Sequence, residues 1–573
     1  MAAATKRGFL RQAWDLASPY WNSEEKWTAR GLLLAVVALN LITVALNVRL
    51  NAWNNDFYDA LQQYNWSEFW RQFLIFGIIA FSLIVVAVYS LYLRQILHIR
   101  WRRWLTDRFL RNWLENQAYY RMQLDHATTD NPDQRISDDL DRFATITLAL
   151  SLGLLSSFVT LASFVTILWT LSGALTIPLG ALSIEIPGYM VFAALIYAVG
   201  GTLFTRWIGN PLIRLNFDQQ RYEADFRFSM VRLRENAENV AFYGGEAREF
   251  DTFKTRFGRI VGNWWGIIRR RKKLTWFTTS YSQLAIIFPF VVAAPRYFNK
   301  TIQLGGLMQI SSAFNQVQDS LSFIITSYTE IAEYQSVVQR LSGFSERMQG
   351  IAAENSAPQP IEVERRGAGV EVDMLDLNLP DGQLLRPNIS LAAGRGEALL
   401  ITGASGLGKS TLLRAIAGLW PFGRGRIRVG DGRCLFLPQR PYLPLGTLAD
   451  ALVYPRAAAE LSREALAEAL RAVGLPELVE RLDEEANWAQ RLSIGEQQRL
   501  AFARVLLARP EIVFLDEATS ALDEAAEISL YRLLREAPWR PTIVSVGHHG
   551  TLRRFHDAVV DLARSPVSRA VVG

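Results

Sequence analysis

Long apolar runs dominate the first 353 residues, and polar, arginine-rich segments separate them. About 20 apolar residues cross the hydrocarbon core of a bilayer as one helix, so runs of this length predict transmembrane helices. Three runs are nearly free of charge, namely 31–48, 73–93 and 144–172. Three weaker runs follow at 189–205, 274–294 and 304–328. The last is the least apolar because it contains Gln309, Asn315, Gln316, Gln318 and Asp319. The pattern predicts six membrane spans.

Basic residues test this count, because short cytoplasmic loops collect Lys and Arg. Arginines follow the second run, and after the fourth run residues 269–273 read Arg-Arg-Arg-Lys-Lys, whereas residues 171–189 contain no Lys or Arg. Six spans with both termini in the cytoplasm satisfy this alternation. Tryptophans near the run ends are typical of interfacial anchors: Trp27, Trp53, Trp66, Trp70, Trp207 and Trp276. We expect the basic runs to reflect topology; the alternative is attraction of an anionic cargo.

Three further segments of this part are predicted to be helical. Residues 1–27 mix aromatic and charged side chains without a cleavable apolar core, which favours a cytoplasmic or interfacial helix over a signal peptide. The cytoplasmic segments 94–143 and 206–273 are longer than topology requires. In the first of them, apolar residues recur at helical spacing: Trp101, Trp104, Leu105, Phe109 and Trp113. Such extensions are suited to transmit motion to a soluble domain, or they are simply solvated helical hairpins.

The remaining chain has a different pattern. After a membrane domain at 28–340, residues 341–366 include a small, polar, proline-containing stretch and are predicted to be a linker. Beyond them, short β-rich runs alternate with helical ones, which predicts an α/β domain over 367–573.

Charge divides the chain in the same way. The net charge of +6 is the sum of +8 in the first 353 residues (35 basic, 27 acidic) and −2 in the rest (26 basic, 28 acidic). The basic excess therefore belongs to the membrane part, and it excludes a nucleic-acid partner as its explanation. The single cysteine, Cys434, excludes an internal disulfide and a four-cysteine zinc site.

A phosphate-binding pattern opens the α/β domain. Residues 398–402 resemble a buried strand, and a helical run begins at Leu412. Between them stands a match to G-x-x-x-x-G-K-[ST]: Gly403, Ala404, Ser405, Gly406, Leu407, Gly408, Lys409, Ser410 and Thr411. Glycines let backbone N–H groups surround phosphates, and the helix N-terminus adds positive potential. Lys409 would reach the β- and γ-phosphates and Ser410 a Mg²⁺ ion. Lys409 is also the only lysine after Glu354, which indicates a site that needs a compact ammonium.

A second acidic motif complements this loop. The apolar run 511–515 ends in Asp516 and Glu517. At a strand end, Asp516 is placed to hold Mg²⁺ and Glu517 to polarise the attacking water. Two solvated acids after a buried strand are the alternative, which the phosphate loop disfavours.

With four further motifs, the domain resembles the ATP-binding cassette (ABC) superfamily. Residues 492–499 (LSIGEQQR) are similar to its signature motif and residues 520–523 (SALD) to its D-loop. Gln439 stands where the family has its Q-loop glutamine, and His548, next to His549, resembles the switch histidine. The resemblance implies ATP and Mg²⁺ as cofactors. It implies a catalytic set of Lys409, Gln439, Glu517 and His548. It also implies metal ligation by Ser410, Gln439 and Asp516, and nucleotide contacts from the signature residues Ser493, Gly495 and Glu496.

The resemblance also implies an architecture: a six-helix membrane domain of the exporter-like type IV class, fused to an α/β P-loop NTPase. Because the signature motif completes the partner's site, one such chain implies a homodimer with two composite sites. Residues 48–61, 130–136 and 418–420 resemble bacterial SbmA/BacA-related transporters, and residues 241–246 (AFYGGE) resemble the peroxisomal fatty-acyl transporters of subfamily D. A bacterial inner-membrane location is therefore expected.

These resemblances leave the cargo open. The first favours import of peptides or other bulky polar compounds, and the second favours fatty acids or acyl-CoA. Within the sixth run, Ser312, Gln316 and Asp319 share one helical face. Because an intramembrane carboxylate usually faces a wet cavity, this face is a candidate substrate path and favours polar cargo; a structural hydrogen bond between helices is the alternative. A membrane-anchored regulatory ATPase without cargo is a hypothesis of another class.

One departure from the family concerns the base of the nucleotide. No Phe, Tyr or Trp occurs between Phe344 and Trp420, so the aromatic residue that many members stack on adenine is absent. We expect aliphatic contacts instead, with Leu375 and Leu377 as candidates, and similar activity with ATP and GTP.

Overall fold

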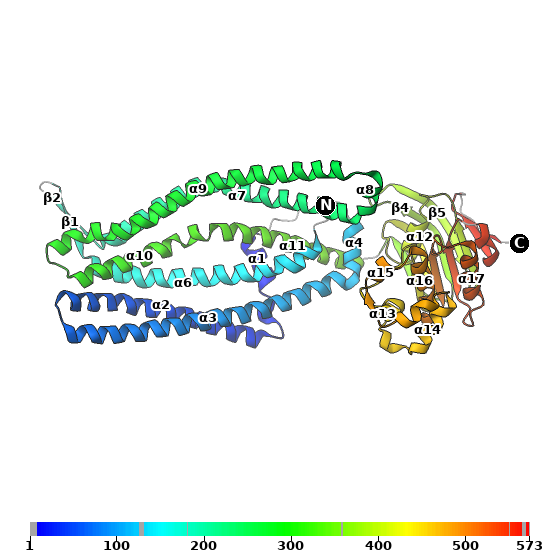
Figure 1. Cartoon of the computed structure of the whole chain (residues 1–573), viewed down its shortest axis with the longest axis horizontal. Coiled ribbons are helices and arrows are strands. Elements are labelled where there is room, and N and C mark those ends of the chain that lie inside the picture. Colours follow the sequence, from blue (N-terminus) through cyan, green and yellow to red (C-terminus); the bar gives the residue numbers. More distant parts are fainter. Residues whose placement is uncertain are drawn as a thin grey trace. The chain divides into compact units, whose positions relative to one another are not determined.

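The apolar runs of the first part lie within much longer helices (Figure 1). The computed structural model describes residues 8–124, 131–179, 182–356, 359–548, 550–563 and 569–571. The chain divides into two units, residues 1–115 with 130–348 and residues 116–129 with 349–573. The long helices of the first unit are α2 (Lys26–Gln62), α3 (Trp66–Leu114), α6 (Leu140–Ser172), α7 (Tyr189–Glu235), α9 (Glu246–Phe298), α10 (Leu304–Thr326) and α11 (Tyr328–Ser356). Shorter ones are α1 (Phe9–Ala17), η1 (Tyr20–Asn22), α5 (Pro132–Gln134), η3 (Arg135–Asp139) and α8 (Ala237–Tyr243).

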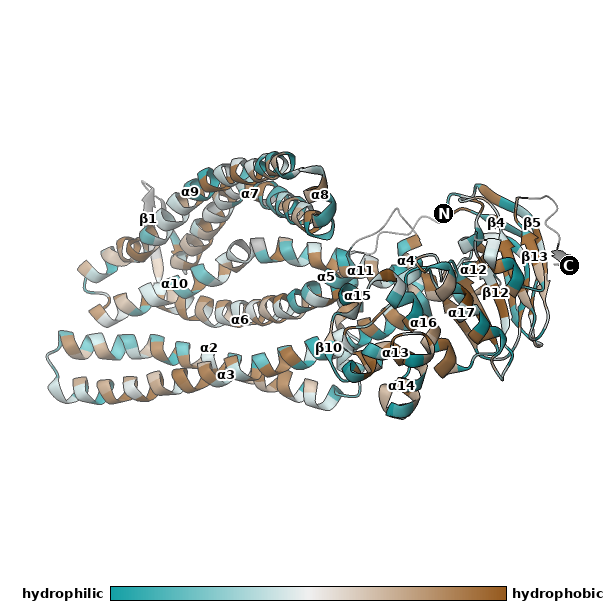
Figure 2. Cartoon of the chain, turned by 45° about the vertical axis from the view of Figure 1, so that its right-hand side comes forward, coloured by the Kyte–Doolittle hydropathy of each residue, from teal (hydrophilic) through white to brown (hydrophobic). Residues whose placement is uncertain are grey.

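Five helices of the described residues are long and apolar enough to cross a membrane: α2, α3, α6, α7 and α9. Apolar residues cover α3 and much of α2 (Figure 2). These five match five of the predicted spans. The helix α10 forms where the sixth was expected but is not among the five, so that span stays a prediction.

The predicted cytoplasmic extensions are helical, as expected. In the C-terminal part of α3, buried residues recur at four-residue spacing: Trp101, Leu105 and Phe109. Tyr20 is fully buried and stacks on Trp101 with ring centroids 5.7 Å apart. The α1–η1 segment is therefore fixed against this extension through an aromatic contact.

The segment 171–189, which contains no Lys or Arg, forms a β-hairpin between α6 and α7. Strand β1 (Ala174–Leu179) pairs antiparallel with β2 (Leu182–Pro187) in continuous register. Pairing satisfies backbone groups that a short loop between two helices would leave to solvent.

The predicted linker, 341–366, contains regular structure and includes the boundary between the two units. Helix α11 continues to Ser356, and strand β3 occupies Ile361–Arg365. Helix α11 has a buried face within this segment, which its small polar residues do not indicate. Phe344, Met348 and Ile351 recur there at three-to-four spacing and are all buried.

The second unit is an α/β domain built on two sheets. A six-stranded sheet has the order β14-β13-β6-β12-β11-β8 and is parallel except for β14, and a four-stranded sheet has the order β3-β7-β4-β5. The remaining strands are β4 (Val370–Asn378), β5 (Leu384–Ala393), β6 (Ala398–Thr402), β7 (Gly423–Val429), β8 (Cys434–Leu437), β9 (Gly446–Thr447), β10 (Glu485–Ala486), β11 (Ile512–Asp516), β12 (Thr542–Val546), β13 (Ala558–Asp561) and β14 (Arg569–Val571). The helices are α12 (Lys409–Ile416), α13 (Leu448–Val453), η4 (Ala458–Glu460), α14 (Arg463–Ala472), η5 (Pro476–Arg481), α15 (Trp488–Arg491), α16 (Ile494–Ala508), α17 (Glu524–Arg535) and η6 (Gly550–Phe555).

A segment of the first cytoplasmic extension also belongs to this second unit. After the short η2 (Glu115–Gln117), helix α4 (Ala118–Leu124) places Leu124 against the apolar cluster that contains Leu412 and Trp420. Asn355 donates a hydrogen bond to the carbonyl of Asn116 at 3.3 Å.

Candidate functional site

The phosphate loop lies at the carboxyl end of β6, where parallel strands commonly present ligand sites. Gly403, Gly406 and Gly408 have φ angles of 141°, 84° and 84°, which favour glycine. The N–H groups from Ala404 to Gly408 donate no hydrogen bond within the described residues. Free amides on a turn that opens a helix can surround the oxygens of a phosphate chain.

Lys409 begins α12 and folds back over this loop. Its Nζ donates hydrogen bonds to the carbonyls of Gly403 at 2.9 Å and Ala404 at 3.0 Å, and the side chain is buried. The ammonium is thus held at the loop and can exchange carbonyl partners for phosphate oxygens.

Ser410 and Asp516 form the candidate metal pair. The Ser410 hydroxyl donates to Oδ1 of Asp516 at 2.9 Å, because β11 ends in the same sheet as β6. Burial raises the pKa of Asp516, and Glu517 beside it contributes, while the bond from Ser410 opposes the shift. A cation would relieve this cost, and two hard oxygen donors with open positions for phosphate oxygens suit Mg²⁺.

The third predicted metal ligand, Gln439, contacts Glu517 rather than the metal pair. Its Nε2 lies 3.3 Å from Oε2 of Glu517, and Nε2 of His548 lies 3.3 Å from Oε1 of the same carboxylate. Glu517 follows β11 with a φ of 49°, a conformation that non-glycine residues rarely adopt. Glu517 is therefore held from both sides at the strand ends. His549, the other candidate for the switch position, lies outside the described residues.

Gln498 was not predicted as a site residue, although it lies in the quoted signature segment. Its side chain is buried and donates to the carbonyl of Gln439 at 3.0 Å and the hydroxyl of Ser520 at 3.3 Å. Its Oε1 accepts from the N–H of Ala521 at 3.0 Å. Gln498 thereby ties α16 to the Q-loop and the D-loop. The signal for it is a polar residue among the buried positions of α16.

The signature residues are positioned by the start of α16. Ser493 caps the helix by accepting from the N–H of Glu496 at 3.3 Å, while Glu496 accepts from the N–H of Ser493 at 2.8 Å. A Cβ on Gly495 would lie 3.1 Å from the carbonyl of Ala521, which explains the glycine. Within the described residues, no hydrogen bond or ion pair joins these three residues to their own phosphate loop. Within the described residues the N–H group of Gly495 donates no hydrogen bond, so it is available to a second chain.

The predicted aliphatic contacts to the nucleotide base, Leu375 and Leu377, are wrong. Leu375 and Leu377 are fully buried between strands, because they point into the apolar core of this unit. Leu385 is the aliphatic side chain that touches the phosphate loop, since a Cβ on Gly408 would lie 3.0 Å from its Cδ2.

In the first unit, Ser312, Gln316 and Asp319 occupy the outer face of α10. Asp319 is exposed, and Ser312 and Gln316 are half-buried, whereas Phe314 and Val317 face the core. Within the described residues Asp319 forms no ion pair or hydrogen bond, so the interhelical bond offered as the alternative is not formed within this chain.

Each of the two units matches a known protein family. Residues 16–298 match the family profile described as ABC transporter transmembrane region 2, and residues 387–520 match the profile described as ABC transporter. ABC transporter D family member 2 of Arabidopsis thaliana is 34% identical over 98% of this chain and 87% of that protein. The chain belongs to the ABC transporter family. It is an ABC half-transporter related to subfamily D, and its cassette drives transport by ATP hydrolysis.

Two further relatives extend the comparison. The human lysosomal cobalamin transporter ABCD4 is 28% identical over 82% of this ABC transporter and 80% of its own length. The structure of a bacterial Atm1-family ABC exporter with ATP bound superposes with a TM-score of 0.75, at 18% identity, over 93% of this chain and 94% of that one. The expected exporter-like fold is confirmed. The resemblance to SbmA/BacA-related transporters stays a prediction.

Proposed function

We propose that this ABC transporter works as a homodimer with two composite ATP sites and moves a bulky polar compound across a bacterial inner membrane. Among the described residues of one chain, the phosphate loop and the capped signature helix make no polar contact with one another. Each signature helix can therefore serve a phosphate loop only in a second copy, and this separation carries the proposal of a dimer. Cytoplasmic termini and an inner-membrane location rest on the distribution of Lys and Arg.

At each site, the chain's own groups take distinct roles. The free amides of the phosphate loop and Lys409 bind the phosphates, and Ser410 and Asp516 would hold Mg²⁺, which neutralises phosphate charge when bound. Glu517 orients and deprotonates the attacking water, and Gln439 and His548 fix its carboxylate. The capped N-terminus of α16 stabilises the γ-phosphate in the partner's site.

The cargo class rests on α10. The face that carries Ser312, Gln316 and Asp319 is turned away from the chain's own core and contains an unpaired carboxylate. Such a face suits a polar path better than an acyl chain. The name of one relative, a cobalamin transporter, supports a bulky polar cargo, and peptides belong to the same class.

The test is ATP hydrolysis by the purified homodimer in liposomes, with cobalamin, a cationic peptide and acyl-CoA as separate additions. We expect stimulation by a polar compound and its uptake, with both lost in Glu517→Gln while ATP still binds. Asp319→Asn should lower uptake at least tenfold. Ser320→Ala is the matched control, because that hydroxyl bonds only the carbonyl of Gln316 in its own helix. If acyl-CoA alone stimulated ATP hydrolysis, the proposed polar cargo would be wrong and an acyl cargo would take its place. If no compound stimulated hydrolysis, a membrane-anchored ATPase without cargo would be favoured.

A further inference from the structure

The run Arg269–Lys273 encircles helix α9. Consecutive residues of an α-helix are separated by about 100°, so five in a row point in every direction around the axis. Four of the five are exposed and Arg270 is half-buried. Only one side of α9 packs on α7 here, since Leu274 contacts Gly209. Several of the cations must therefore point away from the chain.

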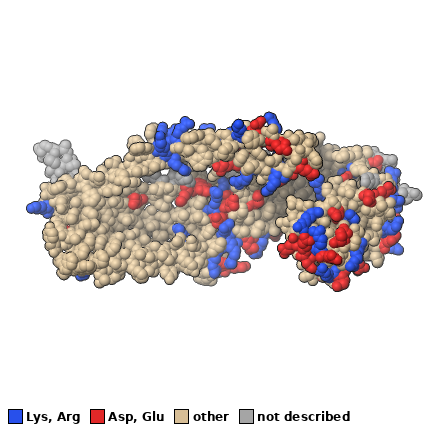
Figure 3. All heavy atoms as spheres, in the orientation of Figure 1, with Lys and Arg blue, Asp and Glu red and all other residues tan. Residues whose placement is uncertain are grey.

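This run marks the level at which the apolar part of the helix pair begins. Trp276 follows three residues later and is 72% exposed, and Trp207 of α7 is 76% exposed. The ring centroids of Phe204 and Phe277 lie 5.7 Å apart. Because these residues are close in sequence to Trp207 and Trp276, the two tryptophans lie at a similar level along the α7–α9 pair. In Figure 3 a blue patch lies on the upper edge, where a mostly tan surface with few charged side chains begins. Exposed tryptophans next to Lys and Arg are typical of the headgroup region.

None of the five cations forms an ion pair or hydrogen bond within the described residues. Arg206 of α7, which is exposed at the same boundary, forms no ion pair there either. Two arginines in the cytoplasmic extension of α3 are different. Arg103 pairs with Glu25 at 2.5 Å and Arg102 pairs with Asp141 at 3.2 Å. Both sites would satisfy topology, but within the described residues Arg102 and Arg103 have counter-ions and the α9 run has none.

We propose that Arg269–Lys273, together with Trp207 and Trp276, binds the headgroups of anionic phospholipids in the cytoplasmic leaflet. Lys and Arg immediately cytoplasmic of a span are attracted to anionic lipid, and the tryptophan rings fix the depth of the helix. The guanidinium groups can bind phosphate in bidentate geometry. The site is distinct from the ATP site and from the polar face of α10.

The test measures lipid binding to the full-length protein in detergent micelles, with phosphatidylglycerol or phosphatidylcholine added and bound lipid counted by native mass spectrometry. We expect phosphatidylglycerol to be preferred and the preference to fall as salt is added. The variant Arg269→Gln/Arg271→Gln/Lys273→Gln should weaken phosphatidylglycerol binding roughly 100-fold, as expected for the loss of three surface cations. Arg269→Lys/Arg271→Lys should keep most of it.

A matched control removes three exposed cations farther along the same helix, Arg248→Gln/Lys254→Gln/Arg259→Gln, and should bind phosphatidylglycerol like the wild type. Equal binding by the run variant and the wild type would overturn the proposal and leave the run as a topology signal. Displacement of the lipid by inorganic phosphate or coenzyme A would overturn it in favour of a soluble anion. Glu517→Gln should bind lipid normally, so this test is independent of hydrolysis and of cargo.

Discussion

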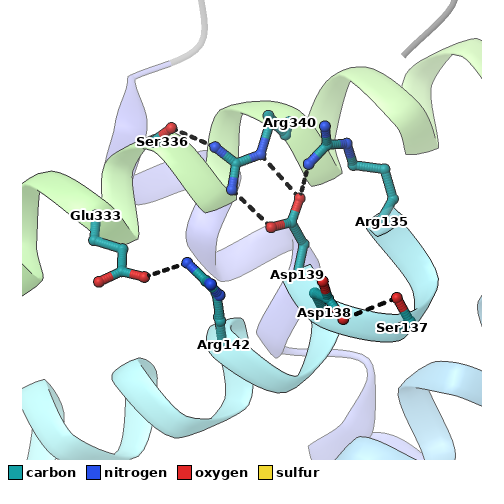
Figure 4. Close-up of polar contacts among 8 residues, drawn as sticks. All are labelled: Arg135, Ser137, Asp138, Asp139, Arg142, Glu333, Ser336 and Arg340. Carbon is teal, nitrogen blue, oxygen red and sulfur yellow. Dashed lines mark hydrogen bonds and ion pairs between the residues drawn. The ribbon is translucent and has the colours of Figure 1, made fainter. Parts of the chain in front are cut away.

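Arg340 of α11 donates two hydrogen bonds to the carboxylate of Asp139, with N–O distances of 2.9 and 2.6 Å (Figure 4). Arg135 binds the same carboxylate from its own helical turn. Asp139 and Arg135 are almost fully buried, so the acid neutralises two cations in a place that excludes water. The pair joins the residues that precede α6 to the helix that follows α10.

Asp139→Asn should therefore destabilise the membrane unit. Removing the charge leaves two guanidinium groups without their counter-ion, and breaking a buried pair typically costs about 3–5 kcal/mol. Thermal unfolding of the purified protein measures the loss. The neighbouring pair Arg142–Glu333 is 49% and 40% exposed, so Glu333→Gln serves as the control and should cost less than about 1 kcal/mol. Equal losses of stability in the two variants would contradict a stabilising role for the buried Arg340–Asp139–Arg135 group.

Gln498→Leu should uncouple the loops around Glu517. The substitution removes the bonds to Gln439, Ser520 and Ala521 while keeping the size of the side chain. We expect hydrolysis to fall at least tenfold with ATP affinity changed only a few-fold, because the phosphate loop is not involved. Steady-state hydrolysis and equilibrium nucleotide binding separate the two effects. Gln497→Leu is the control, since the hydrogen bonds of the Gln497 side chain within the described residues go to the carbonyls of Ala489 and Leu492 and not to these loops. Unchanged turnover in Gln498→Leu would rule out this role.

Sequence reasoning found the site residues that follow a strand directly. Asp516 and the phosphate loop stand at the ends of apolar runs, and parallel pairing of β6, β12 and β11 brings such ends to one edge. Local pattern and fixed spacing were sufficient there. Gln498 was missed because its role depends on contacts with two loops that are distant in sequence.

The errors have physical causes as well. Leu375 and Leu377 were chosen by their distance from the phosphate loop, but the register of β4 turns both into the core. Strand direction decides which side chain reaches a ligand, and distance along the sequence does not. In the segment 341–366, three large apolar residues on one face of α11 extend the helix beyond what the small polar residues indicate.

ATP and GTP should be hydrolysed with kcat/KM values within about threefold of each other. No aromatic residue occurs between Phe344 and Trp420, and stacking on such a ring contributes about 1–3 kcal/mol per base. Leu385 offers only apolar contact, which does not distinguish the two purines. Leu385→Ala should raise KM for both nucleotides by the same factor. An ATP preference above 100-fold would show that a polar contact to the base exists.

His556 should make the cassette sensitive to acid. Burial lowers its pKa to about 4, while its ring nitrogens contact the carbonyl of Leu552 at 2.7 Å and the hydroxyl of Ser545 at 2.8 Å. The unfolded chain binds a proton near pH 6.5 and the folded chain does not until about pH 4, so this contribution to stability is full above pH 6.5. It is lost as the pH falls through that window, by up to about 3 kcal/mol. Thermal unfolding at pH 7 and pH 5 should show a smaller acid shift in His556→Gln than in the wild type. Because each protein is compared with itself at pH 7, loss of packing in the variant cancels, and equal acid shifts would assign the sensitivity to other groups.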